Sequence, residues 1–60
     1  MTTEQINRAA SYLRAAGVLT QQDERVLTIA LNRVKLGQPL SESVRKNTED
    51  LLFLHKGMTA

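Results

Sequence analysis

Apolar residues recur every three or four positions in three stretches of the chain, which is the spacing of one side of an α-helix. The stretches cover residues 4–16, 21–36 and, starting at 41 or 42, up to 56. Polar residues occupy the opposite side of each stretch. The pattern predicts three amphipathic helices with inward-facing positions at Ile6, Ala9, Ala10, Leu13 and Ala16, at Val26, Leu27, Ala30, Leu31 and Val34, and at Val44, Thr48, Leu51, Leu52 and His55.

Residues that start helices precede all three stretches. The Thr2–Thr3 pair, Thr20 and Ser41 stand just before them. A Ser or Thr side chain at such a position accepts a hydrogen bond from a free N–H of the first turn. Thr2 with Gln5, and Thr20 with Asp23, also have the spacing of a capping box. We therefore expect helices to begin at these three points.

A glycine follows each stretch. Gly17, Gly37 and Gly57 stand where glycine commonly closes the last turn in a left-handed conformation. The connection around residues 17–20 is short, which favours antiparallel packing of the first two helices. Pro39 marks a clearer break before the third helix. The sequence predicts an all-α fold of three short helices, the first two an antiparallel hairpin with the third packed across it, in a single domain of residues 1–60.

Two groups of large apolar residues do not fit this core. Ile29 and Leu36 lie together beside Arg33, away from the main apolar side of residues 21–36. A middle helix that contacts both neighbours would cover them, and this is the favoured interpretation; a self-association surface is the alternative. Phe53 lies roughly opposite Leu51, so it is an ordinary exposed aromatic, an anchor for a partner, or a residue that folds back after an early helix end.

The inventory of reactive side chains is small. The 60 residues contain no cysteine and one histidine, His55, so thiolate sites and multi-histidine sites are absent. His55 is expected to pack on the apolar side or to bond a carbonyl. The adjacent acidic pairs Asp23–Glu24 and Glu49–Asp50 point in different directions on a helix and form no ready two-carboxylate site. We therefore predict no enzyme activity, no cofactor, no metal and no small-molecule substrate.

The charge permits nucleic-acid binding without requiring it. Eight basic and six acidic residues give a formal net charge of +2. Three short helices are also the layout of helix-turn-helix proteins, in which the start of the recognition helix contacts bases. Arg45, Lys46 and Asn47 are the candidates for this role. Acidic neighbours on the same helix and the long turn containing Pro39 argue against it.

These observations favour a small protein-interaction module, a regulator, adaptor or inhibitor that binds another protein or a second copy of itself. Phe53, Ile29, Leu36 and Arg33 are the predicted contact residues. A small DNA- or RNA-binding regulator that uses Arg45, Lys46 and Asn47 is the alternative. The chain has no long apolar run and no basic, apolar leader at its start, so we expect a cytoplasmic protein that does not contact membranes.

Overall fold

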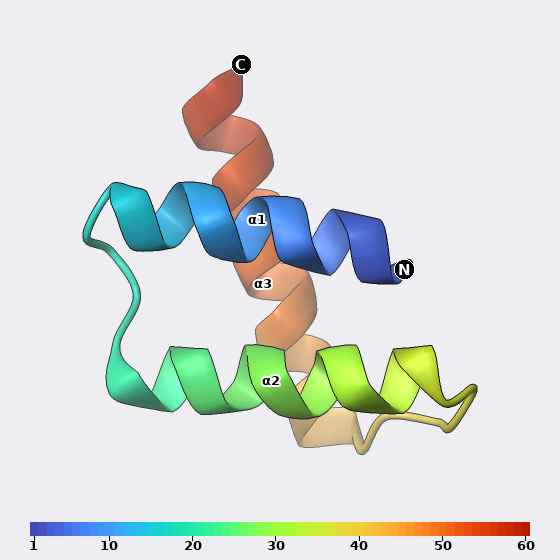
Figure 1. Ribbon diagram of the computed structural model, residues 1–60. Coiled ribbons are helices and arrows are strands. Elements are labelled where there is room, and N and C mark those ends of the chain that lie inside the picture. Colours follow the sequence, from blue (N-terminus) through green and yellow to red (C-terminus); the bar gives the residue numbers. More distant parts are fainter.

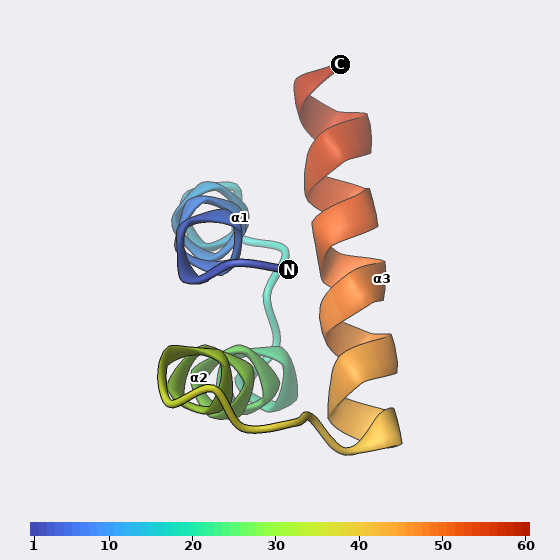
Figure 2. The same cartoon turned by 90° about the vertical axis from the view of Figure 1, so that its right-hand side faces the viewer.

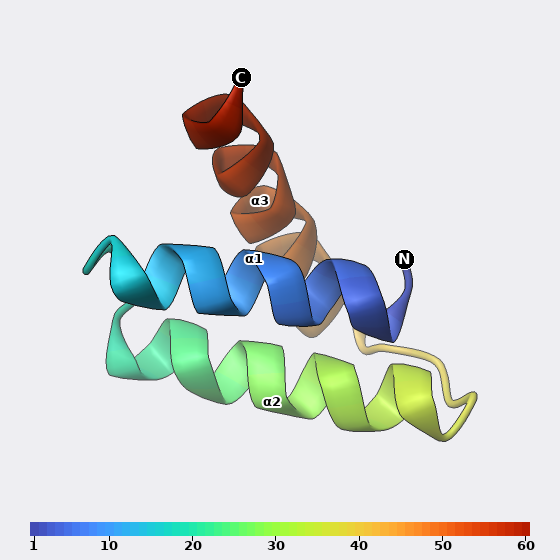
Figure 3. The ribbon, with the colours of Figure 1, turned by 45° about the horizontal axis from the view of Figure 1, so that its top comes forward.

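The structure, a computed structural model, describes residues 1–60 as three α-helices without strands. They are α1 (Thr3–Ala15), α2 (Gln21–Lys35) and α3 (Glu42–Thr59). Helices α1 and α2 run antiparallel, side by side in one layer, and α3 crosses behind both (Figure 1). The view along α1 and α2 places α3 upright against one side of that layer (Figure 2), and the tilted view shows the same hairpin (Figure 3). The predicted three-helix fold is confirmed.

The predicted helix starts are present. The Thr2 side chain accepts a hydrogen bond from the Gln5 backbone N–H at 3.1 Å, and the Gln5 side chain accepts one from the Thr2 N–H at 2.9 Å. Thr20 and Asp23 form the same reciprocal pair. The Ser41 hydroxyl accepts a hydrogen bond from the third N–H of α3. These side chains satisfy N–H groups that have no partner inside the helix, which fixes where each helix begins.

Gly17 and Gly37 close α1 and α2 as expected. Their φ angles are +73° and +71°, in the left-handed region that favours glycine. At α1 the N–H of Gly17 donates to the Arg14 carbonyl and that of Val18 to the Leu13 carbonyl. The corresponding two bonds follow Gly37 at the end of α2. This is the hydrogen-bond pattern of the Schellman motif, which satisfies the last carbonyls and turns the chain.

The prediction that Gly57 ends the third helix is wrong. Helix α3 continues through Gly57 to Thr59, and Gly57 has no positive φ. A glycine inside a helix costs only about 1 kcal/mol relative to alanine, so a packed helix can pass through one. The Tyr12 hydroxyl of α1 donates to the Met58 carbonyl at 3.3 Å and ties the last turns of α3 to α1.

The core lies between the α1–α2 layer and α3. Its central buried residues are Ile6, Ala10, Leu13, Leu27, Ala30 and Leu51. Leu19, Leu31, Val34, Leu40 and Val44 pack around them and are partly buried. Thr48 is fully buried, and its hydroxyl donates to the Val44 carbonyl one turn earlier at 2.7 Å. The core is aliphatic, as the shortage of aromatic residues predicted.

Candidate interaction surfaces

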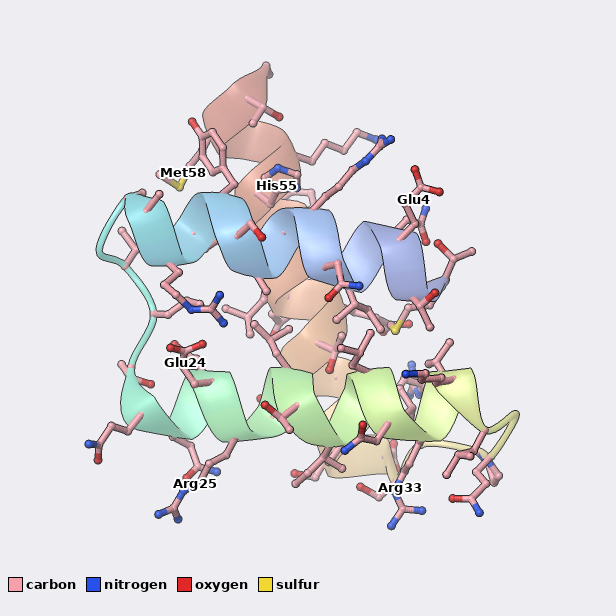
Figure 4. The ribbon with its side chains drawn as sticks, in the orientation of Figure 1. Glu4, Glu24, Arg25, Arg33, His55 and Met58 are labelled. Carbon is pink, nitrogen blue, oxygen red and sulfur yellow. The ribbon has the colours of Figure 1, made fainter.

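Three of the four predicted contact residues lie together on α2. Ile29, Arg33 and Leu36 share one side of that helix with Arg25, because positions four or seven apart are neighbours on a helical surface. Ile29 is 42% exposed and Leu36 is 70% exposed. Arg25 and Arg33 point away from α1, along the outer border of the molecule (Figure 4). We call the surface formed by Arg25, Ile29, Arg33 and Leu36 the α2 edge.

Packing against two neighbours does not cover this edge. Helix α2 does contact both α1 and α3, but it does so with Val26, Leu27 and Ala30, which are buried. Leu36 is the C-cap residue of α2 and stays largely in solvent. The interpretation in which a middle helix covers Ile29 and Leu36 is therefore wrong for Leu36 and only partly right for Ile29.

Phe53 belongs to a different surface. It is 77% exposed, whereas Leu51 is 8% exposed and faces the other helices. Side chains two positions apart on a helix point about 200° away from each other around its axis. Phe53 therefore points away from the α1–α2 layer. Helix α3 is intact on both sides of it, which excludes an early helix end. The structure thus divides the predicted contact residues into three on the α2 edge and one on the outward side of α3.

Three ion pairs neutralise some of the charged side chains on the surface and leave others without a partner. Arg8 pairs with Glu4, Arg14 with Glu24, and Arg45 with Glu49. The Arg14–Glu24 pair joins α1 to α2, and its hydrogen bonds hold the pKa of Glu24 below the ordinary value of a glutamate. Figure 4 shows Glu24 on the side of α2 that faces α1. Arg25, Arg33 and Lys35 of α2 take part in no ion pair.

The alternative nucleic-acid residues lie at the start of α3. Arg45, Lys46 and Asn47 are all exposed. Arg45, however, donates to the Glu49 carboxylate at 2.9 Å. Of the two basic residues, only Lys46 is without an ion-pair partner.

His55 is half-buried where α3 passes α1. Its ring lies 5.1 Å from that of Tyr12, centroid to centroid, with the planes inclined by 53°. The predicted packing of His55 is confirmed, but its ring nitrogens make no hydrogen bond to a carbonyl, and its aromatic neighbour was not expected. Residues 43 positions apart in the sequence meet here, and no local pattern indicates such a contact.

The depressions of the surface are small or open to solvent. A partly open pocket of about 80 Å³ lies between α1 and α2, beside the Arg14–Glu24 pair. Ligand sites typically occupy about 300–1,000 Å³ of concave space. The depressions near His55, of about 570 and 290 Å³, and near Ile29, of about 330 Å³, are comparable in volume but more open to solvent. No three His, Cys, Asp or Glu side chains gather as a metal site would require.

None of the three helices combines the length and hydropathy needed to cross a bilayer. No protein-family model, curated protein or solved structure matches the chain.

Proposed function

We propose that the protein is a small protein-interaction module, a regulator, adaptor or inhibitor, and that the α2 edge is its contact surface. The observation that carries the proposal is the exposure of Ile29 and Leu36 in a row with Arg25 and Arg33. Covering exposed large aliphatic side chains removes apolar surface from water, which is the main favourable term in most protein association. Arginine is among the residues enriched at interface hot spots.

Phe53 supports a second, separate contact. A few large side chains carry most of the binding energy of an interface, and Phe53 is the most exposed large apolar residue of the chain. A second copy would meet like charges if the α2 edge packed on itself. A homodimer is therefore expected to use Phe53, which leaves the α2 edge free for a different protein.

Affinity capture with the tagged protein tests the proposal. The wild-type protein and an Ile29→Ser/Leu36→Ser variant are each incubated with cell extract, with and without nuclease. We expect nuclease-resistant retention of a protein by the wild type and loss of most of it by the variant. The control is Val18→Ser/Leu54→Ser, because these two side chains are each 41% exposed and lie outside the α2 edge. Equal retention by all three forms would refute the proposed surface.

Nucleic-acid binding through α3 is the second candidate, and the exposed, unpaired Lys46 beside Asn47 favours it. Phosphate contacts release counterions, so such binding would weaken steeply with salt. Arg45→Ala/Lys46→Ala should then reduce it. Capture that disappears with nuclease, together with sensitivity to these two substitutions, would support this candidate instead.

A further inference from the structure

The solvent-facing side of α2 has no acidic residue. Asp23 and Glu24, the only acidic residues of the helix, are half-buried and already engaged. The Asp23 carboxylate accepts a hydrogen bond from the Thr20 N–H at 3.1 Å, and Arg14 donates to Glu24. The exposed residues of the helix and its C-cap are Gln21, Gln22, Arg25, Thr28, Ile29, Asn32, Arg33, Lys35 and Leu36. This side therefore carries the charges of two arginines and one lysine without a neutralising partner.

The two large apolar residues on this side, Ile29 and Leu36, lie seven positions apart, and the related positions Gln22, Arg25 and Asn32 are polar. A spacing of seven keeps two residues in one seam when two helices pack side by side. In such a seam Ile29 and Leu36 would be about 10.5 Å apart along the helix axis, two turns. One partner helix could therefore cover both.

We propose that the α2 edge binds an acidic amphipathic helix of a partner protein. The apolar residues of that helix would cover Ile29 and Leu36, and its Asp and Glu side chains would face Arg25 and Arg33. This inference rests on the proposed function and specifies the chemistry of the partner. Charge complementarity of this kind raises the rate of encounter and rejects partners of the wrong sign.

Other occupants fit this side less well. A second copy presenting its own α2 would bring arginines against arginines. The outward side of α3 offers Glu42 and Asp50, but Lys46 lies among them and Glu49 is paired with Arg45, so that side is close to neutral. A nucleic-acid backbone would neutralise the cations, but the phosphates that do so are charged and would not give Leu36 an apolar partner.

Titration of the labelled protein with designed peptides tests the inference. Two helical peptides of roughly three heptads carry the same leucine seam, one flanked by Glu and the other by Lys. A mixed-sequence DNA duplex of about 20 base pairs is the third probe. Amide chemical shifts report where each binds. We expect the Glu peptide to shift amides of residues 25–36 and to bind at least about 10-fold more tightly than the Lys peptide.

Charge reversal on the α2 edge supplies the matched comparison. Arg25→Glu/Arg33→Glu should weaken binding of the Glu peptide at least about 10-fold. Lys46→Glu/Lys56→Glu changes the net charge equally on α3 and should leave binding within about 3-fold. Circular dichroism checks that each variant is helical, and Arg25→Gln/Arg33→Gln replaces the reversal variant if it unfolds.

Three results would overturn the inference. The two peptides could bind with equal affinity, or the α3 control variant could lose as much affinity for the Glu peptide as the α2 variant does. The third is that DNA, and not the Glu peptide, changes the amide chemical shifts of α2. If the peptide preference fails while partner capture still depends on Ile29 and Leu36, only the acidic character of the partner is wrong. If capture also loses that dependence, the proposed function fails with it.

Discussion

Arg14 of α1 and Glu24 of α2 are joined by three hydrogen bonds across the hairpin. The guanidinium Nε lies 3.1 and 3.2 Å from the two carboxylate oxygens, and Nη2 lies 2.6 Å from one of them. The pair fastens the end of α1 to the start of α2. The pair also neutralises the charge of Glu24 on the side of α2 that faces α1. The exposed side chains of α2 are therefore either basic or uncharged.

The Arg14–Glu24 pair predicts a specific dependence of stability on pH. Because the pKa of Glu24 is lowered in the folded protein, the stabilisation is fully present above the unfolded carboxyl pKa of about 4.3. It is lost as the pH falls through the lower folded value. We expect Tm, followed by circular dichroism, to fall more steeply below about pH 4.3 in the wild type than in Glu24→Gln. Parallel curves would contradict this role of the pair.

Gly57 and Gly17 should respond differently to substitution by alanine. Gly57→Ala should stabilise the protein by about 0.5–1 kcal/mol, because Gly57 is helical and no atom beyond its own stretch of helix backbone lies within 4 Å of the added methyl group. Gly17→Ala should destabilise it by about 1 kcal/mol, because φ at Gly17 is +73°. Chemical denaturation measures both changes. A destabilising Gly57→Ala would mean that α3 ends before this residue.

Leu51 and Phe53 provide a contrast between core and surface on one helix. Leu51→Ala should destabilise the protein by about 2–4 kcal/mol, because it opens a cavity in the core. Phe53→Ala should change stability by no more than about 0.5 kcal/mol, as surface substitutions usually do. Thermal unfolding of the two variants tests this. A loss at Phe53 as large as that at Leu51 would make Phe53 a core residue and remove it as a contact candidate.

Tyr12 should hold the end of α3 in two separable ways. Tyr12→Phe removes the hydrogen bond to the Met58 carbonyl and keeps the ring against His55, so the expected cost is about 1 kcal/mol or less. Tyr12→Ala removes both contacts and should cost more. Hydrogen exchange of the amides in residues 55–59 is the measurement, with faster exchange expected in the order wild type, Phe, Ala. Unchanged exchange in both variants would show that α3 is held without Tyr12.

Local chemistry explains why much of the fold could be predicted. Thr20 and Gly37 act through bonds to residues a few positions away, and these bonds are visible in the sequence. Gly57 could not be judged in this way, since a glycine ends a helix only where the chain turns, and the Tyr12 contact comes from another helix. Ile29 and Leu36, which are both exposed, were also ambiguous, because their exposure depends on the direction in which α3 crosses α2.

The central claim is that the α2 edge meets the protein partner. Hydroxyl-radical footprinting of the free protein and of the captured complex, read by mass spectrometry, measures this directly through oxidation of Leu36 and Phe53. In the free monomer both should be oxidised, since they are 70% and 77% exposed. In the complex we predict that oxidation of Leu36 falls several-fold while that of Phe53 is unchanged. Protection of Phe53 with Leu36 still fully oxidised would contradict the account and move the contact to α3.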